Sequence, residues 1–403
     1  MRADLGFNGF SRFIGFMRFA AAVTVAVALA HISVSGQLQN GSLAGVGTIP
    51  GVNPNGPIKV LPVRGNIYVL MGGGANITLS VGLDGVLMVD SGSAEMSDQV
   101  LAAIRSVQQW VEARSAAAAP PVLFGAETRN SIIEARRADA PPKPIRYIVA
   151  TSIAPDHIGG NVKISSAGQT FTGGNVAGQL SDASQGAAIL AHENLQNRMA
   201  NPQAGQPTFP TRAQLTDTYP TDSMKLSNFF NGEGIVLMHQ PAAFTDGDTM
   251  VHFRGSDVIA AGEVFRTTTY PVMDVARGGT INGVIEGLNH IIDLAVPEFR
   301  SEGGTLVIPA YGRISDIADV AYYRDMTTIL RDRIQDMVKK GMTLEQVKAA
   351  KPTADYDGRY GATTGPWTTD MFIEAVYKTL PREAASRPAA PPTGGTPKRG
   401  ATK

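Results

Sequence analysis

The chain has 403 residues, which is enough for one large α/β domain or two small ones, each with an ample core. Its 35 lysines and arginines balance 35 aspartates and glutamates, so the formal net charge is zero and no basic surface for nucleic acid is expected. The sequence contains no cysteine, which excludes thiolate catalysis, disulfides and cysteine-ligated metals.

Residues 1–36 have the layout of a secretory signal peptide. Three arginines precede an apolar run from Phe19 to Ala30, which ends in a small-residue cleavage pattern. The run has 12 residues, too few to cross a hydrocarbon core of about 30 Å. We therefore expect a secreted or periplasmic protein with no stable membrane span beyond this segment. An uncleaved anchor that recruits residues 13–17 is the alternative, but Arg18 interrupts it.

Runs rich in β-branched residues follow a flexible leader at residues 37–57. These runs predict strands over residues 58–63, 66–71, 76–82 and 85–90. A helix with apolar residues at helical spacing is expected from Ser97 onward.

Two polar stretches indicate insertions near residues 113–143 and 200–232. Before the second, residues 191–199 predict a helix that holds His192 and Glu193. Adjacent side chains point about 100° apart around a helix, so these two are not expected to converge on one ion.

The stretch from Ala150 to Gly160 holds the most informative motif. A strand-like run leads into a short loop with an Asp-His pair, Asp156 and His157, and a Gly-Gly turn. This loop resembles the metal loop of the metallo-β-lactamase superfamily, whose pattern is T-H-x-H-x-D-H-x-G-G. Strand order, glycine turns and spacing extend the resemblance over residues 58–380.

The resemblance implies an α/β fold, a four-layer αββα sandwich with a helical C-terminal extension over residues 321–380. It also implies that Asp90 braces the metal loop by hydrogen bonds. Within the extension, Thr343 and Gln346 form a capping-box pattern. Residues 381–403, rich in Pro and Gly with scattered charges, read as a disordered tail.

The ligand positions of the family are altered in this chain. Ser152 and Ala154 stand where the two leading histidines of the loop belong. The turn at residues 243–248 resembles the family's H-T-x-G-D, with Phe244 in place of the third histidine. In the family these three histidines hold one metal, so the resemblance implies that this first site is lost.

The second metal site is only partly retained. Asp156 and His157 remain, and Tyr311 stands in place of the last histidine. Glu263 replaces the aspartate that bridges the two metals in the family. Asp156, His157, Glu263 and Tyr311 could hold one divalent ion, zinc, iron or manganese, with oxygen donors favouring the latter two; the alternative is no metal at all.

The loss of metal decides how much activity can be expected. A bound metal can lower the pKa of water from ~15.7 to ~7, or ~12 kcal/mol of ionisation, whereas a general base such as Asp156 supplies only ~10²–10⁴-fold. We therefore expect a protein without the family's dinuclear zinc hydrolase activity, which binds a small-molecule ligand or a protein partner.

Two alternatives remain open at this point. The first is a mononuclear metal-dependent hydrolase of a small ester, amide or thioester that uses Asp156, His157 and Glu263. The second is metal-free chemistry through Tyr311, His157 and Ser152, since a hydroxyl beside an imidazole can act as a nucleophile.

Overall fold

The computed structural model describes residues 56–117, 143–170, 186–202, 208–226, 229–298 and 303–381. The predicted signal peptide, nearly all of the leader, most of the insertion near 113–143 and the predicted tail beyond residue 381 lie outside these ranges. All described residues belong to one unit of the chain, Gly51–Lys403.

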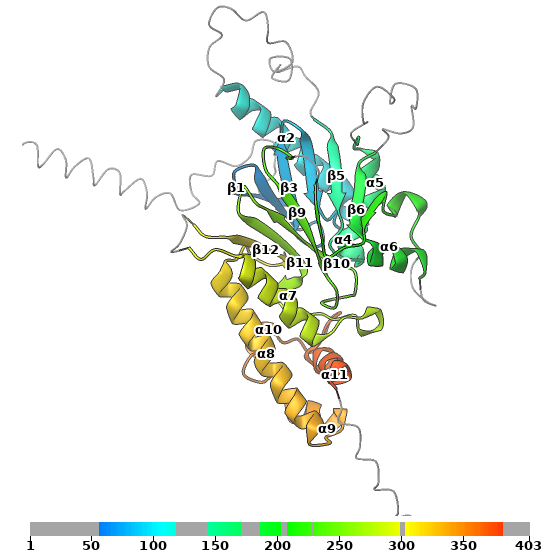
Figure 1. The fold of residues 1–403 in the computed structure, drawn as a ribbon, viewed down its shortest axis with the longest axis vertical. Coiled ribbons are helices and arrows are strands. Elements are labelled where there is room, and N and C mark those ends of the chain that lie inside the picture. Colours follow the sequence, from blue (N-terminus) through cyan, green and yellow to red (C-terminus); the bar gives the residue numbers. More distant parts are fainter. Residues whose placement is uncertain are drawn as a thin grey trace, which may run out of the picture. The chain divides into compact units, whose positions relative to one another are not determined.

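The first sheet has seven strands in the order in which they occur in the chain (Figure 1). They are β1 (Lys59–Arg64), β2 (Ile67–Met71), β3 (Ile77–Gly82), β4 (Gly85–Val89), β5 (Ile145–Val149), β6 (Ala188–His192) and β7 (Asp217–Tyr219). Strands β1 to β4 pair antiparallel and β4 to β7 pair parallel. Parallel neighbours need crossover connections, which the helices between these strands provide.

The second sheet has five strands in the order β12-β11-β10-β9-β8. They are β8 (Ser223–Lys225), β9 (Ile235–Gln240), β10 (Asp248–Phe253), β11 (Val258–Arg266) and β12 (Leu306–Tyr311). The polar stretch near 200–232, predicted as an insertion, thus adds the edge strand β7 to the first sheet and the edge strand β8 to the second. Each of these strands has only 3 residues, too few to show an alternating pattern.

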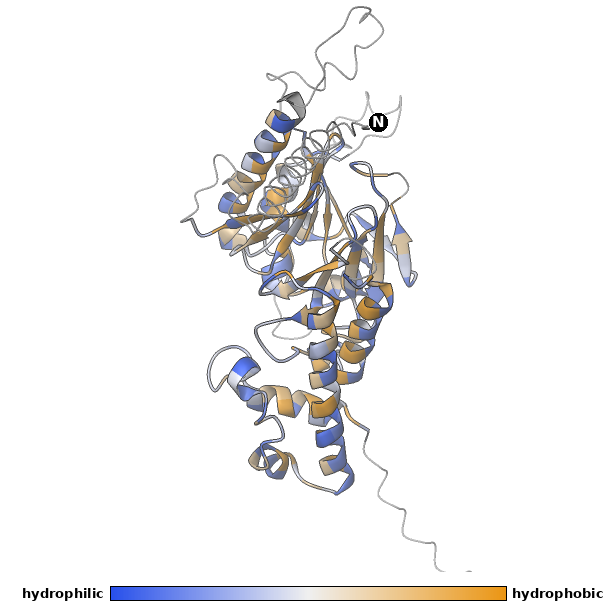
Figure 2. Cartoon of the chain, turned by 90° about the vertical axis from the view of Figure 1, so that its left-hand side faces the viewer, coloured by the Kyte–Doolittle hydropathy of each residue, from blue (hydrophilic) through white to orange (hydrophobic). Residues whose placement is uncertain are grey.

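The two sheets pack face to face through alternate apolar residues. Ile67 and Val69 of β2 meet Val251 and Phe253 of β10 in one buried cluster. Alternation arises because successive side chains of a strand point to opposite faces. Figure 2 shows hydrophobic residues concentrated on the strands and on the helix faces that cover them.

Helices cover the outer faces of both sheets. The first sheet carries α2 (Ser97–Ala117) and α5 (Asn161–Ser166). The second sheet packs its outer face on α7 (Ile281–Leu294), beyond which lie α8 (Ile317–Lys339) and α11 (Thr369–Thr379). The layers are helix, sheet, sheet, helix, which confirms the predicted αββα sandwich.

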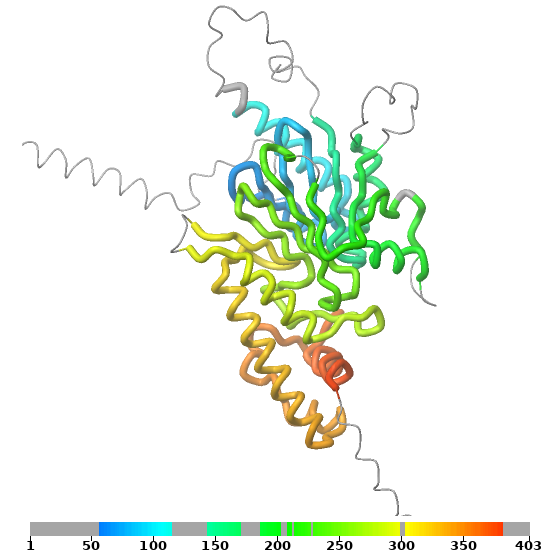
Figure 3. Tube along the Cα trace, viewed as in Figure 1, coloured from blue at the N-terminus to red at the C-terminus, as the bar shows by residue number. Residues whose placement is uncertain are grey.

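The C-terminal helices form the predicted extension, coloured orange to red in Figure 3. Between α8 and α11 lie α9 (Leu344–Ala349) and α10 (Asp357–Tyr360). The capping box is confirmed, because the Thr343 hydroxyl accepts from Gln346 N–H while the Gln346 side chain accepts from Thr343 N–H. No helix in the described ranges is long and apolar enough to cross a membrane.

One predicted boundary was wrong. The helix expected over residues 191–199 is α6 (Glu193–Ala200), and His192 is instead the last residue of β6. The His192 side chain caps α6 by accepting from Asn194 N–H, and its ring stacks on that of His239 at 3.5 Å between centroids. Strand pairing on both sides of β6 outweighs the local helical preference of its alanines.

Candidate functional site

The loop after β5 turns sharply into the short helix α4 (Pro155–Ile158). Proline at the first helical position favours this start, because its φ is already helical and its missing N–H is not needed there. The glycines that follow are required by close packing. A Cβ at Gly159 would lie 2.7 Å from Ala94 N, and a Cβ at Gly160 would lie 2.3 Å from Ser91 O.

Asp90 fixes this loop through hydrogen bonds from its side chain. It follows β4 with a positive φ of 65°, and its side chain is buried. Its carboxylate accepts from Thr151 N–H at 2.8 Å and from the Thr151 hydroxyl at 2.7 Å. It also bonds the Nδ1 of His157 at 2.7 Å, which fixes the orientation of the imidazole.

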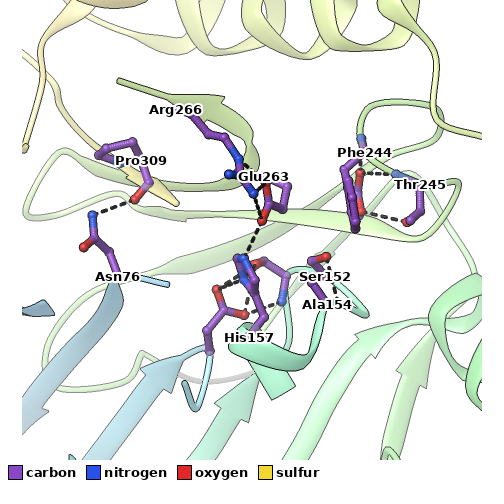
Figure 4. Close-up of polar contacts among 12 residues, drawn as sticks. Asn76, Ser152, Ala154, His157, Phe244, Thr245, Glu263, Arg266 and Pro309 are labelled. Atoms are coloured by element: carbon purple, nitrogen blue, oxygen red, sulfur yellow. Dashed lines mark hydrogen bonds and ion pairs between the residues drawn. The ribbon is translucent and has the colours of Figure 1, made fainter. Parts of the chain in front are cut away.

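The opposite nitrogen of His157 contacts a second carboxylate. His157 Nε2 lies 2.8 Å from Oε1 of Glu263 on β11 (Figure 4). Glu263 follows Gly262, where φ is +53° and the pairing with β12 changes register. A Cβ at Gly262 would lie 2.7 Å from Thr151 Cβ, so glycine allows β11 to approach the loop.

Arg266 completes the arrangement from the end of β11. Its Nε donates to Glu263 Oε2 at 2.6 Å and its Nη2 to Oε1 at 2.5 Å, a bidentate pair. The guanidinium lies 4.4 Å from the centroid of the Tyr311 ring, a cation–π distance. We call Asp90, His157, Glu263 and Arg266 the ion network.

Contacts within the ion network shift the pKa values of His157 and Glu263. Burial opposes protonation of His157, but Asp90 and Glu263 outweigh it and raise the pKa of the imidazole well above its usual value. Burial also opposes ionisation of Glu263, yet Arg266 and His157 lower the pKa of this carboxyl to about 2. The carboxyl groups of Asp90 and Glu263 thus each contact a basic side chain of the network.

The side chains at the family's first metal site do not fit a metal. Ser152 is buried, and its hydroxyl accepts from Ala154 N–H at 3.2 Å. Phe244 packs against an apolar cluster that includes Ile153 and Leu195. None of the three substituted positions offers the nitrogen, sulfur or carboxylate ligand that zinc prefers.

The second site does not fit a metal either. Both nitrogens of His157 and both carboxylate oxygens of Glu263 already bond side chains of the ion network. Across the described ranges, no group of three or more His, Cys, Asp or Glu side chains could hold an ion.

The predicted ligands are therefore only partly brought together. His157, Glu263 and Tyr311 lie around Arg266, with the His157 and Tyr311 rings 6.4 Å apart between centroids. Asp156 is half-buried, and its main-chain oxygen accepts from Ala75 N–H. Within the described part of the chain, no hydrogen bond or ion pair links its carboxylate to the other three. Ser152 and Tyr311 likewise make no hydrogen bond to His157 there.

Two residues with buried polar contacts at the site were not predicted from the sequence. Arg266 lies three residues after Glu263, and this spacing of opposite charges beside a buried strand was the only available signal. Asp248 lies at the end of the turn that holds Phe244, and its carboxylate accepts from the N–H groups of Phe244 and Thr245. Burial raises the pKa of Asp248 to about 7, against the effect of these hydrogen bonds.

Comparisons with known proteins found similar solved structures only at low sequence identity. No family model and no curated protein matches the chain. Similar solved structures include a sec-alkylsulfatase, Pisa1 from Pseudomonas sp., at 14% identity and a TM-score of 0.48, which covers 80% of this chain and 50% of the sulfatase. This chain therefore spans about half the length of that enzyme.

Metallo-β-lactamases are also among the similar structures. The enzyme from Pontibacter korlensis has 11% identity and a TM-score of 0.42, with 67% of this chain and 99% of that chain covered. DIM-1 has 14% identity and the same TM-score, with 68% and 98% covered. At such identities and TM-scores, the fold is assigned from the motif order, strand order and layers described above. By these features the chain has the metallo-β-lactamase fold, with the ion network around the loop that holds His157.

Proposed function

We propose that this protein is a non-catalytic member of the metallo-β-lactamase fold, which binds a small ligand or a partner and lacks a dinuclear metal centre. The observation that carries the proposal is the bonding of His157. The imidazole nitrogen opposite the one that Asp90 braces is bonded to Glu263, and Arg266 holds that carboxylate twice. The charge of this carboxylate is therefore already balanced by a side-chain cation.

Energetics support the same conclusion. An ion at this position would have to displace Arg266, and breaking a buried ion pair costs about 3–5 kcal/mol. The ion would also require His157 and Glu263 to give up their present bonds to the ion network. Ser152, Ala154 and Phe244 supply no ligand for a second ion beside it. Without a metal, the ~12 kcal/mol by which a metal assists ionisation of water is also absent.

Elemental analysis of the purified, metal-loaded protein tests the proposal. We expect far less than one zinc, iron or manganese ion per chain, both in the parent protein and in Asp156→Ala. Assays with nitrocefin and 4-nitrophenyl acetate are expected to show no metal-dependent turnover. Near-stoichiometric metal that disappears in Asp156→Ala would overturn the proposal, and metal-dependent turnover with it would favour the mononuclear hydrolase built on Asp156, His157 and Glu263.

We also propose that the protein is exported and works outside the cytoplasm. The support is the N-terminal pattern of arginines, an apolar run and small residues within positions 1–36. A sequence without cysteine is compatible with an oxidising compartment.

A further inference from the structure

Helix α6 is fixed to the turn that holds Phe244 through contacts with Asp246. The side-chain amide of Asn194 donates to Asp246 O at 2.9 Å, and the Arg198 guanidinium donates to the Asp246 carboxylate at 2.7 and 3.2 Å. The helix lies beside α4 (Figure 1), and its Leu195 belongs to a buried apolar cluster against which Phe244 packs. These contacts keep the apolar cluster covered.

Two stacked histidines, His192 and His239, lie where α6 begins, and we call them the histidine pair. Their ring planes differ by 5° and their centroids are 3.5 Å apart. His239 Nε2 lies 2.8 Å from Asp246 O, and this nitrogen carries a proton because a carbonyl oxygen only accepts. His192 Nδ1 accepts from Asn194 N–H at 3.2 Å, so this nitrogen is unprotonated.

The two imidazoles therefore differ in their response to a proton. A proton on His192 Nδ1 removes the cap of α6, because an imidazolium has two donors and no acceptor for Asn194 N–H. Its charge also lies at the N-terminus of a helix, where the dipole disfavours a cation. A proton on His239 Nδ1 breaks no hydrogen bond among the described residues, since Nε2 still donates to Asp246 O.

The charged groups around His192 act in both directions. Its pKa lies below the usual value, chiefly because burial opposes the charged form and also because His239 is close. Glu193, Asp222 and Asp246 favour the charged form but do not outweigh these two effects.

Two further groups face the histidine pair. The ring of Tyr219 on β7 lies 5.2 Å from that of His192, and burial raises the pKa of Tyr219, so its hydroxyl stays uncharged. The guanidinium of Arg198 adds a positive charge on the side of α6, where it is bonded to Asp246. Neither group favours a proton on His192.

We propose that the histidine pair releases α6 from the turn that holds Phe244 when the pH falls. The pair accommodates one proton on His239. A second proton, on His192, breaks the bond from Asn194 N–H and places two positive charges in stacked rings. The helix then opens and uncovers the apolar cluster to which Leu195 belongs. This response uses neither a metal nor the ion network, so it is independent of the proposed function.

Acid favours the open helix because opening lets His192 regain its usual pKa of about 6.5, above that of the closed state. The contribution of His192 to the closed state is therefore complete above pH 6.5 and is lost as the pH falls toward the lowered pKa. Since opening takes up one proton, the protection of α6 against hydrogen exchange falls by up to about tenfold per pH unit in this window.

Hydrogen–deuterium exchange of the full chain, followed by mass spectrometry of its peptides, tests the proposal between pH 7.5 and pH 5. After correction for the intrinsic exchange rate at each pH, the protection of residues 194–200 is expected to fall about fivefold or more below pH 6.5. The protection of β9 and β10 is expected to stay constant, because these strands lie in the interior of a sheet.

Three variants identify the group that responds. His192→Asn keeps a side chain that caps a helix but does not titrate, so the protection of α6 is expected to change by less than about twofold. His239→Gln keeps an amide donor and removes the neighbouring charge, so the release is expected to move to higher pH. His252→Asn on β10 is the matched control, because the pKa of His252 is also lowered by burial, and the response of α6 is expected to persist in it.

Constant protection of α6 from pH 7.5 to pH 5 in the parent protein would overturn the proposal. So would an equal fall in His192→Asn, because that side chain takes up no proton. Should His192→Asn not fold, a release in His239→Gln at the same or a lower pH than in the parent protein would overturn it as well.

Discussion

Arg266 supplies the positive charge that keeps Glu263 ionised in a buried position. Its planar guanidinium matches both oxygens of the carboxylate, which a lysine could not do. His157 then lies between two carboxyl groups, which raise the pKa of its imidazole well above the usual value against the effect of burial. Because each charge depends on its neighbours, removal of one member leaves an uncompensated charge in the interior.

Replacing Arg266 by methionine is therefore expected to lower the free energy of unfolding by about 3–5 kcal/mol at pH 7. The parent protein has a Glu263 pKa lowered from 4.5 to about 2, so its stabilising effect is present above pH 4.5 and is lost as the pH falls toward 2. Without Arg266 this pKa rises, and the acid-induced loss begins at a higher pH. Urea unfolding between pH 3 and pH 8 measures both effects.

Arg313→Met is the control for this substitution. Arg313 pairs with Asp319 on the surface and is 62% exposed, so its loss is expected to cost about 1 kcal/mol or less. An Arg266→Met protein as stable as Arg313→Met at neutral pH would show that the ion network does not stabilise the fold.

The altered ligands could be identified from the sequence, but the ion network could not. Ser152, Ala154 and Phe244 occupy fixed places in recognisable motifs. The role of Arg266 depends on the change of register at Gly262 and on the approach of β11 to the loop that holds His157, and neither is encoded in a local pattern.

Among the elements, α7 fixes the turn that carries Phe244. A Cβ at Gly283, in the first turn of α7, would lie 1.9 Å from Ala242 O, and one at Gly279 would lie 2.0 Å from Phe244 O. Thr280 N–H also donates to Ala242 O at 2.9 Å. The start of the helix thus rests directly on the backbone of the turn.

Gly283→Ala is expected to destabilise the protein by about 1–3 kcal/mol, because the added methyl group forces the turn away from the helix. In Gly358→Ala the same change in α10 meets nothing within 4 Å, so it is expected to be neutral or to stabilise by about 0.5–1 kcal/mol. Unfolding midpoints in urea compare the two variants. A Gly283→Ala protein at least as stable as Gly358→Ala would disprove this account of the turn.

Element type was predictable where the hydrophobic pattern is long. The strands predicted over residues 66–71 and 85–90 correspond to β2 and β4, and the helix predicted from Ser97 corresponds to α2. The short strands β7 and β8 and the parallel strand β6 escaped notice, because pairing with neighbours defines them more than their own composition does.

At the scale of the whole molecule, most of the interior lies outside the ion network. Its two main cores lie between the sheets and beneath the C-terminal helices, and both are built from apolar residues. Hydrophobic burial of this kind requires no bound ion. The hydrophobic patterns that indicate the fold are spread over the whole chain, so substitutions at a few site residues do not erase them. For this reason the fold was predictable from the sequence, whereas the reaction was not.

The N-terminal segment leads to a prediction about the full-length chain. Expressed in a bacterium with a periplasm, the protein is expected to be recovered there with a mature N-terminus between Ala30 and Gln37, as measured by mass spectrometry of the intact chain. Replacing Ala28 and Ala30 by tyrosine is expected to shift or block cleavage. An uncleaved chain that stays in the cytoplasm would contradict the export proposal.

If the proposed function is correct, the ion network also makes a return to metal binding difficult in evolution. A single mutation that returned a histidine at Phe244 would add one ligand while Arg266 still held Glu263. If Arg266 were lost first, the buried carboxylate of Glu263 would have no guanidinium partner. This would remove about 3–5 kcal/mol of a typical free energy of unfolding of about 5–15 kcal/mol. Each stepwise route back thus passes through a protein that is either poorly folded or still without metal, and selection has no improved intermediate to retain.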